Sequence, residues 1–258
     1  YHPHFFHPIY VLNTPDTISK GLNSGVSPDS LHAYLDMLES FKNRNTGSDT
    51  LSATQGIGAA RRWAYSKFKE FSSRNDNRLI PSYLQFDENI CGVMQHRDVF
   101  AVLPGLDTTD KSIIIIEAHM DSRCTGLCDT GCSATGMEDN GSGTALVMEL
   151  ARVMSRFSFD HTIVFLLTIA EEQGLDGAQA FASYAQQHGI KIKAVLNNDV
   201  VGGIYCGHTS SPPGCPGYLA IDSTHVRLFS NGGYNSPHKG LVRYMKLQYN
   251  EMIRPITA

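Results

Sequence analysis

Three apolar runs in this chain each lead to histidine or acidic residues, and this arrangement limits the possible folds more than any other feature. The runs are residues 113–116 before His119 and Asp121, residues 162–170 before Glu171 and Glu172, and residues 194–196 before Asp199. Four consecutive isoleucines at 113–116 suit a strand buried on both faces, because apolar runs without polar alternation are typical of parallel sheets. The sequence therefore predicts three buried strands.

Helical patterns separate the three runs. Apolar residues recur at helical spacing over residues 142–157 and 174–188, so the order from 112 to 199 is strand, helix, strand, helix, strand. This order describes two crossover connections between parallel strands. The predicted fold class is α/β, with a mostly parallel central sheet and helices on both faces. Ligands of such sheets bind beyond the carboxyl ends of the strands, so the polar residues after the three runs are candidates for one site.

The rest of the chain predicts the surroundings of this sheet. Residues 81–86 and 91–103 have strand-like patterns, and residues 87–89 between them suit a turn, so we expect an antiparallel hairpin at the sheet edge. Further helices are expected over residues 27–43, 54–71 and 236–252. Residues 1–26 are expected to form an extended arm, because two prolines among the first eight residues prevent a continuous helix there.

Length and charge exclude several classes of protein. The chain has 258 residues, of which 41% are hydrophobic, so residues 27–258 are expected to form a single α/β domain around one core. A formal net charge of -4 gives no reason to expect a nucleic-acid or anionic-membrane partner. The longest apolar stretches are about nine residues, against the roughly 20 that a membrane span needs, so no membrane span is expected.

The six cysteines leave several arrangements open. Cys206 and Cys215 bracket a short turn and could form a local disulfide, which would favour an oxidising compartment. Cys124, Cys128 and Cys132 recur at every fourth residue and could bind a metal, although structural zinc sites usually pair cysteines two residues apart. A loop disulfide plus one buried thiol is the alternative for these three. On this basis we expect a secreted or periplasmic protein.

The polar residues at the strand ends form a candidate metal site. His119, Glu171, Glu172 and Asp199 follow the strands, and Asp139 follows a Gly- and Cys-rich loop after the first of them. Imidazole and carboxylates without thiolate suit Zn, Mn or Co in a hydrolytic site, and a pair of such ions needs a bridging carboxylate and terminal ligands. Acidic residues after strands also often cap the next helix, but the convergence of three strands favours a metal site.

Four segments resemble a known family, the co-catalytic zinc aminopeptidases related to bacterial leucyl aminopeptidase, which form peptidase family M28. The segments are His-Met-Asp-Ser at 119–122, Gly-Met-Glu-Asp-Asn-Gly-Ser-Gly at 136–143, Ala-Glu-Glu-Gln-Gly-Leu-Asp-Gly-Ala at 170–178 and Asn-Asn-Asp at 197–199. They occur in family order with family-like spacing, and the resemblance covers about residues 110–245. It implies the zinc exopeptidase fold, with phosphorylase/hydrolase-like architecture.

The resemblance implies a metal-binding role for four residues. His119 and Asp199 resemble the terminal ligands of the first metal, and Asp139 resembles the carboxylate that bridges the two metals. Glu172 resembles a ligand of the second metal. Two zinc ions are therefore expected in the complete protein.

The resemblance also implies how the reaction is assisted. Asp121 resembles the acid that orients the ring of His119, a contact that fixes the tautomer and raises ligand basicity. Glu171 resembles the general base that takes a proton from the attacking water and returns it to the leaving amine. In the family the peptide bond after the bridging acid is cis, so a cis bond is expected between Asp139 and Asn140.

One family ligand has no counterpart in this sequence. In the family, a terminal histidine of the second metal comes from a loop after the helix that corresponds to residues 236–252. His208, His225 and His238 lie after Asp199, but none stands in a matching motif. We therefore expect this chain to be a piece of a longer protein, lacking the C-terminal part of its domain and the fifth ligand.

The implied function is that of a metal-dependent aminopeptidase, which hydrolyses the N-terminal peptide bond of a peptide substrate. Two alternatives remain open at this stage. A glutaminyl cyclase-like acyltransferase would need a single zinc, in keeping with an incomplete second site, and a non-catalytic binding domain could keep the fold without metals. Glu171 argues against the binding domain, because a site without activity does not need a general base. Carboxypeptidase-type di-zinc hydrolases have similar segments at different spacing.

Overall fold

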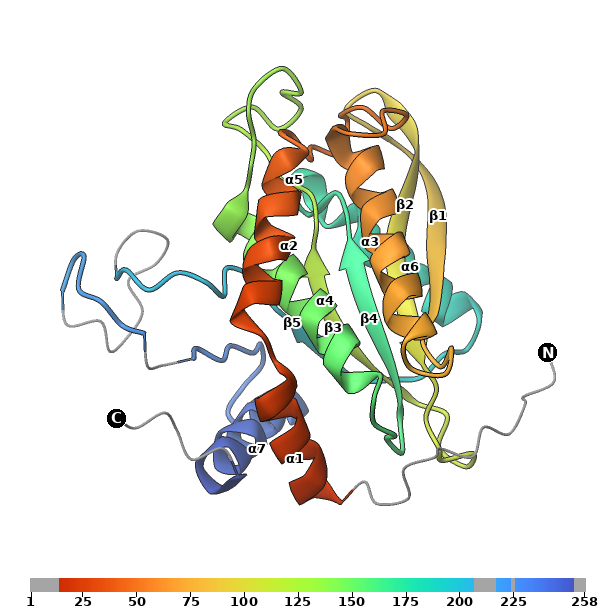
Figure 1. Ribbon diagram of the computed structural model, residues 1–258, viewed down its shortest axis with the longest axis vertical. Helices are drawn as coiled ribbons and strands as arrows, with labels where there is room; N and C mark the ends of the chain where they lie inside the picture. Colours follow the sequence, from red (N-terminus) through yellow and green to blue (C-terminus); the bar gives the residue numbers. More distant parts are fainter. Residues whose placement is uncertain (1–13, 207–216, 224–225, 253–258) are drawn as a thin grey trace. The chain divides into compact units, whose positions relative to one another are not determined.

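The computed structural model describes residues 14–206, 217–223 and 226–252. Its centre is a five-stranded sheet in the order β1-β2-β4-β3-β5 (Figure 1). The strands are β1 (Ile80–Ile90), β2 (Val93–Leu103), β3 (Ile113–His119), β4 (Thr162–Thr168) and β5 (Ile192–Asn197). β3 pairs in parallel with both β4 and β5, and the β1–β2 and β2–β4 pairs are antiparallel. The sheet is therefore mixed, and its parallel part consists of the three strands that the apolar runs predict. The predicted burial is wrong for β5, which contains no buried residue, because it pairs with β3 on one side only among the described strands.

The register brings the ends of the parallel strands together. His119 at the end of β3 stands beside Thr168 at the end of β4, and Glu117 stands beside Asn197 at the end of β5. The residues that follow all three strands consequently leave the sheet at one edge. In Figure 1 this edge points upwards, towards the short helix α5 (Glu171–Gly174).

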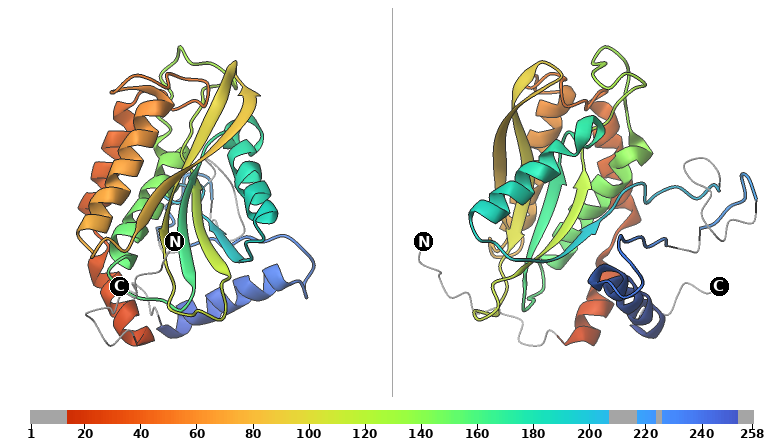
Figure 2. Two further views of the ribbon diagram at one scale, coloured as in Figure 1. Left: turned by 90° about the vertical axis from the view of Figure 1, so that its right-hand side faces the viewer. Right: turned by 180° about the vertical axis from the view of Figure 1, so that it is seen from behind.

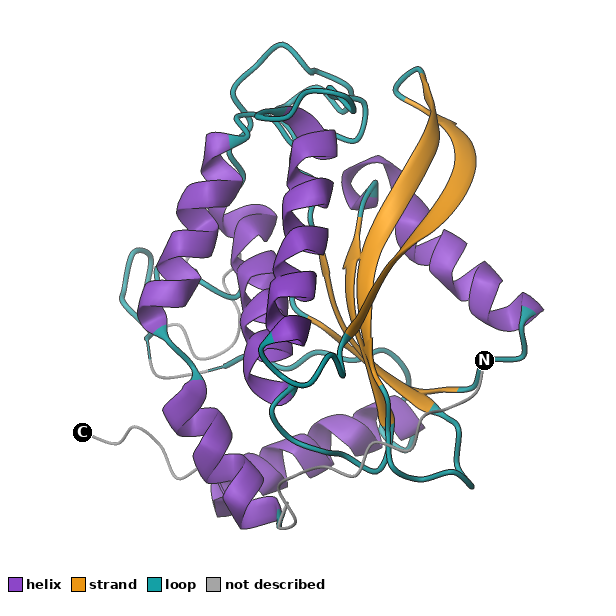
Figure 3. Cartoon of the chain, turned by 45° about the vertical axis from the view of Figure 1, so that its right-hand side comes forward, coloured by secondary structure: helices purple, strands orange, loops and turns teal. Residues whose placement is uncertain are grey.

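Helices cover both faces of the sheet, as predicted. Those in residues 14–202 are α1 (Pro15–Gly25), α2 (Pro28–Ser40), α3 (Gly56–Ser73), α4 (Gly143–Met154), α5 and α6 (Asp176–Gln187). α2, α3 and α4 lie on one side and α6 on the other (Figures 2 and 3). The larger core cluster joins the three helices to the sheet, and a smaller one packs Phe181 of α6 against Ile113, Val164 and Leu166. The α/β fold class is confirmed.

The hairpin at the sheet edge is confirmed, but the predicted turn is wrong. Residues 87–89 lie within β1, and the chain reverses at Cys91 and Gly92, whose φ values are 53° and 82°. A two-residue hairpin turn with positive φ at both positions matches the twist of the flanking strands. Asp87 and Glu88 remain in the exposed end of β1, so their preference for turns does not determine where the chain reverses.

The predicted extended arm over residues 1–26 is wrong for residues 15–25, which form α1. Thr14 caps this helix by accepting a hydrogen bond from the backbone N–H of Thr17, and Pro15 occupies the first helical position. Ser27 and Pro28 start α2 in the same way, with a bond from the N–H of Ser30. A hydroxyl cap followed by proline is a strong helix-start signal, and Thr14-Pro15 carries it as clearly as Ser27-Pro28 does.

The chain forms two compact units, residues 1–202 and 203–258. The single domain expected over residues 27–258 remains a prediction. The second unit contains α7 (Pro237–Met252), close to its predicted bounds, and an isolated bridge between Tyr205 and Ile221. His208, Cys215 and His225 lie outside the described residues, so the possible Cys206–Cys215 disulfide remains a prediction. Among the helices that the structure describes, none combines the length and apolar character of a membrane span.

Candidate metal centre

His119 forms the base of the candidate site. Its side chain is 3% exposed, and its Nε2 atom lies 3.3 Å from a carboxylate oxygen of Asp139 and 3.5 Å from one of Asp199. The carbonyl oxygen of His119 accepts a hydrogen bond from the Thr144 hydroxyl of α4 at 3.0 Å. The backbone of His119 is therefore anchored to α4, and the Nε2 of its imidazole faces carboxylates from two other segments.

Asp139 and Asp199 come from two separate segments of the chain. Asp139 lies just before α4, and Asp199 lies just after β5. One ligand atom from each of the three residues lies within 4.8 Å of the other two. The acidic side chains are partly open to solvent, Asp139 at 57% and Asp199 at 39%. The structure thus brings together three of the four residues predicted to bind metal, on the solvent side of a buried histidine.

Asn140 connects the two aspartates, and the sequence reasoning assigned it no role of this kind. Its side-chain N–H donates to the backbone carbonyl oxygen of Asn198 at 2.9 Å. Its side-chain oxygen, Oδ1, accepts a hydrogen bond from the backbone N–H of Val200 at 3.3 Å. These contacts flank Asp199 on both sides. The Asp139–Asn140 peptide bond is cis, as the resemblance implies. Asn140 therefore links the turn that carries Asp199 to the turn that carries Asp139.

Asp121 is fully buried behind His119. One of its carboxylate oxygens lies 3.3 Å from Nδ1 of His119, an ion-pair contact. The same carboxylate accepts bonds at 3.3 Å from the backbone N–H groups of Glu171 and Glu172. Asp121 therefore contacts both the imidazole and the start of α5, the position expected of an acid that orients the ring.

Glu171 and Glu172 start α5 but face different partners. A carboxylate oxygen of Glu171 is 4.0 Å from Nε2 of His119, and the side chain is 34% exposed. Glu172 is more buried and accepts a hydrogen bond from the guanidinium of Arg123. The structure therefore places Glu171 beside the His119 cluster, whereas Glu172 forms an ion pair with a residue that the sequence reasoning did not select.

The charges around His119 affect its protonation. Burial lowers the pKa of His119, but the carboxylates of Asp121, Asp139 and Asp199 together raise it by more. The net result is a pKa raised to about 12. Burial is also the main cause that raises the pKa of Glu171. A cluster of acids that holds a proton so strongly on one imidazole offers strong attraction to a divalent cation that replaces this proton.

A small pocket adjoins the site on the sheet side. It has a volume of about 80 Å³ and is lined by Glu117, His119, Thr168, Glu171, Leu175, Ala178 and Asn197. Glu117 is mostly buried and accepts a hydrogen bond from the Thr168 hydroxyl at 2.8 Å, and burial raises its pKa. The pocket therefore has one acidic side and one apolar side, next to the candidate general base.

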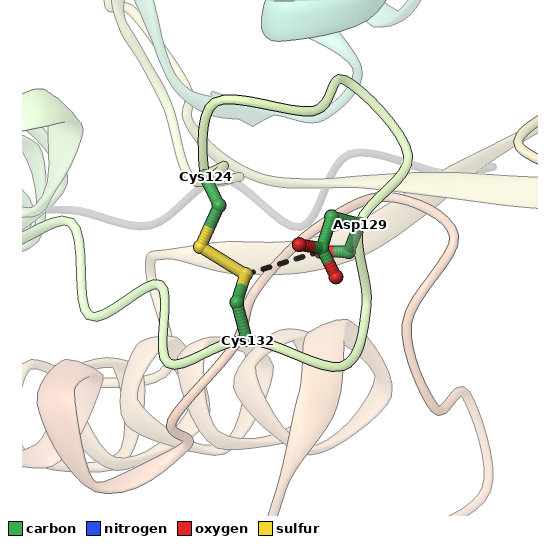
Figure 4. Close-up of side chains that lie close together, drawn as sticks. All are labelled: Cys124, Asp129 and Cys132. Carbon is green, nitrogen blue, oxygen red and sulfur yellow. Dashed lines mark hydrogen bonds between the residues drawn. A yellow bond between two sulfur atoms is a disulfide. The ribbon is translucent and has the colours of Figure 1, made fainter.

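The three cysteines of the 124–132 loop are all in disulfides, so the expected buried thiol is wrong. Cys124 bonds to Cys132, and Cys128 bonds to Cys91 at the tip of the hairpin. Asp129 lies beside the first of these bonds (Figure 4), and its backbone carbonyl oxygen is 3.4 Å from the Cys132 sulfur, which carries no proton to donate. Sulfur atoms bonded to each other provide no thiolate, so this cluster does not fit a metal.

The residues around His119 do fit a metal ion. Ligand atoms around a tetrahedral zinc, each about 2.1 Å from the ion, stand about 3.4 Å apart. The observed separations from Nε2 of His119 to Asp139 and Asp199 are 3.3 and 3.5 Å. One imidazole and two carboxylates at these separations fit a zinc ion, and Asp121 contacts the second ring nitrogen.

The structure of this chain superposes on solved structures of aminopeptidases. The LapA aminopeptidase of Legionella pneumophila superposes with a TM-score of 0.61 at 25% identity, over 80% of this chain and 50% of that one. An aminopeptidase from Aneurinibacillus has a TM-score of 0.55 at 14% identity, over 73% of this chain and 74% of that one, which is evidence of the fold alone. The chain is therefore an α/β protein with the zinc exopeptidase fold.

Sequence comparison finds a match to one peptidase family. Residues 98–205 match the profile of peptidase family M28, which confirms the resemblance predicted from the four segments. A probable zinc metalloprotease of Pyricularia oryzae is 30% identical over 244 residues, covering 90% of this chain and 48% of that protein. The chain spans about half the length of the curated relatives that it matches.

Proposed function

We propose that the protein is a metal-dependent aminopeptidase that removes the N-terminal residue from peptides. The observation that carries this proposal is the cluster at the carboxyl edge of the sheet, where Nε2 of buried His119 faces Asp139 and Asp199 at 3.3 and 3.5 Å. Glu171 lies at the open side of the same cluster. The match to peptidase family M28 and the aminopeptidase neighbours support hydrolysis of peptide bonds by such a site.

In this proposal His119, Asp139 and Asp199 would hold zinc, which when bound supplies Lewis-acid activation of water and of the scissile carbonyl. Asp121 keeps the His119 ring in the orientation that presents Nε2 to the site. Asp139 and Glu172 would be the residues that hold a second zinc ion, and Glu172 would then give up its ion pair with Arg123. The names of the zinc metalloprotease relatives support zinc as the metal.

Glu171 is the proposed general base. Its carboxylate takes a proton from the attacking water, holds it at one oxygen, and returns it to the nitrogen of the leaving amine. The pKa of Glu171 is raised, mainly by burial, which makes its carboxylate a stronger base than an ordinary glutamate. Its partial exposure leaves room for water and substrate, and Asp121 fixes its position through the Glu171 backbone N–H.

The surrounding charge suits a free amine on the substrate. Several carboxylates gather at the open side of His119, and an N-terminal ammonium group would be attracted to them. A peptide with a blocked amine lacks this charge. We therefore propose exopeptidase rather than endopeptidase specificity, with the complete gene product as the active species.

The test is Glu171→Ala in the complete gene product, with Glu39→Ala on the exposed side of α2 as the matched control. Turnover of aminoacyl amides should be lost in Glu171→Ala while bound zinc stays unchanged. A substrate panel with free and blocked amines decides between the alternatives. Cyclisation of N-terminal glutamine without hydrolysis would identify a cyclase, and zinc lost with the side chain would make Glu171 a ligand.

We also propose that the protein is secreted or periplasmic. Two disulfides lie in residues 91–132, and disulfides persist mainly in oxidising compartments. Both bonds should be found intact by mass spectrometry of protein isolated from its source under alkylating conditions. Free thiols at these four cysteines would contradict this location.

A further inference from the structure

The connection between α2 and α3 has an unusual composition for its environment. Asn43, Arg44, Asn45 and Thr46 are all buried, and three of the four have no measurable exposure. From sequence this stretch reads only as a break between two helices. Polar side chains without solvent need hydrogen-bond partners, so the identity of those partners shows what the segment does.

Arg44 connects two of the segments that carry the site. Its guanidinium donates to the carbonyl oxygen of Met120, directly after His119, at 2.9 Å. It also donates to the carbonyls of Thr135 and Gly136, which precede Asp139, at 2.5 and 3.0 Å. Five N–H donors in a rigid fork allow one arginine to join several backbone carbonyls in this way. The position of His119 relative to Asp139 is therefore tied to Arg44.

Thr46 makes the corresponding connection to the segment that carries Glu171. Its hydroxyl oxygen accepts a hydrogen bond from the backbone N–H of Ala170 at 3.0 Å. The hydroxyl proton is then available to the carboxylate of Asp121, whose oxygen lies 3.5 Å away. Ala170 has a φ of 61°, which is uncommon for a residue other than glycine, so this turn needs support from its surroundings.

We propose that Thr46 is a positioning residue of the metal centre, an inference that rests on the function proposed above. Its single hydroxyl contacts both the acid behind His119 and the turn before Glu171. The hydroxyl thereby sets the direction of the Asp121 carboxylate, which in turn contacts Nδ1 of the ring. Without the hydroxyl, Asp121 loses a donor and the N–H of Ala170 loses its acceptor.

A purely structural role for Thr46 predicts different behaviour. A buried hydroxyl that only fills space and pairs one N–H affects unfolding, but the properties of a bound metal should remain the same once the protein is folded. A positioning role changes the metal site in the folded protein. Partners behind a metal ligand typically contribute 10- to 100-fold to metal affinity, so the two roles are separable by experiment.

Thr162 provides a matched control. Its hydroxyl also accepts a backbone N–H bond at 3.0 Å, from Gly105, but at the start of β4 rather than its end. Thr46→Val and Thr162→Val therefore remove the same kind of bond from opposite ends of the sheet. Thr46→Ala and Thr46→Ser form a second pair that differs only in the hydroxyl, should the valine variant fail to fold.

The experiment uses Co²⁺ as the probe in the complete gene product. The visible absorption spectrum reports the coordination of the ion, and titration gives its dissociation constant. We expect Thr46→Val and Thr46→Ala to bind Co²⁺ about 10- to 100-fold more weakly than the wild type, with an altered spectrum. Thr46→Ser and Thr162→Val should retain wild-type affinity and spectrum.

The outcomes separate the two proposals. If folded Thr46→Val or Thr46→Ala binds Co²⁺ as tightly as the wild type and with the same spectrum, the positioning role is overturned. The proposed function is then left intact. An equal loss in Thr46→Ser overturns the role of the hydroxyl as well. No Co²⁺ binding by the wild type would overturn the proposed metal centre itself, and the positioning role with it.

Discussion

The two disulfides near the site should contribute unequally to stability, and the loops that they close set the order. Cys91–Cys128 joins residues 37 apart in sequence, and Cys124–Cys132 joins residues 8 apart. A cross-link limits the unfolded chain more when it closes a longer loop. The perturbation is removal of each pair, as Cys91→Ser/Cys128→Ser or as Cys124→Ser/Cys132→Ser.

The chain-entropy relation gives the magnitudes. It assigns about 4 kcal/mol of unfolding free energy to the longer loop at 25 °C and about 2.6 kcal/mol to the shorter one. The difference of about 1.3 kcal/mol depends only on the ratio of loop lengths, so it is more secure than either value. Removing Cys91 and Cys128 also separates the hairpin tip from the loop whose Leu127 carbonyl accepts a bond from Gln173 of α5.

Urea unfolding of both double variants and the wild type, followed by circular dichroism, measures these free energies. The Cys91/Cys128 variant should lose more stability than the Cys124/Cys132 variant, with similar denaturant slopes. Equal losses, or a larger loss for the shorter loop, would refute the reasoning. Such a result would mean that the unfolded chain is already constrained near residue 91, or that the shorter bond supports native contacts.

Three further predictions concern the site. Because the pKa of His119 is raised to about 12, the metal-free imidazole is protonated at pH 7, so zinc binding should release a proton and strengthen as pH rises. Calorimetry in two buffers of different ionisation enthalpy measures the number of protons released, and zinc binding without proton release would contradict this prediction. Burial raises the pKa of Glu171, so kcat/KM should fall with decreasing pH above the ordinary glutamate range near 4.3; a profile whose acid limb lies at that ordinary value would count against Glu171 as the base. Gly143→Ala would place a Cβ against the carbonyl oxygen of Asn198 and the side chain of Asn140, costing about 1–3 kcal/mol of stability in thermal unfolding, whereas an unchanged midpoint would show that this close approach is not required.

The parallel strands and the meeting of their polar ends were predictable from sequence for a physical reason. A strand covered on both faces is apolar over most of its length, so β3 and β4 are visible as apolar runs, Ile113–Ile116 in β3 and Ile163–Leu167 in β4. The carboxyl ends of parallel strands share one edge, so His119 and Asp199 had to be close once the strands were identified. The proximity of Asp139 came from family resemblance, because the loop before it has no periodic pattern.

The supporting residues could not be found in this way. Thr46 and Asn140 are small polar residues in connecting segments, where such residues are usually exposed. Their burial depends on loops from distant parts of the chain, and no local pattern reports it. The Arg123–Glu172 ion pair is likewise a contact between segments about 50 residues apart, which single-sequence reasoning does not reach.

The disulfide pairing shows the same limit. Six cysteines allow 15 complete pairings, and sequence spacing alone does not choose between them. The pairing of Cys91 with Cys128 requires the hairpin tip to lie beside the 124–132 loop, and the tip itself was misplaced because the turn was assigned to residues 87–89. Gly92 is the sequence signal for a reversal at this point, because glycine readily adopts the positive φ that a two-residue hairpin turn needs.

The central claim is that His119, Asp139 and Asp199 together bind a divalent metal. Anomalous diffraction at the zinc edge, from crystals grown with zinc, tests this claim most directly. The account predicts an anomalous peak about 2.0–2.2 Å from Nε2 of His119 and from a carboxylate oxygen of each aspartate. Zinc bound elsewhere on the molecule, with these three side chains empty, would contradict it.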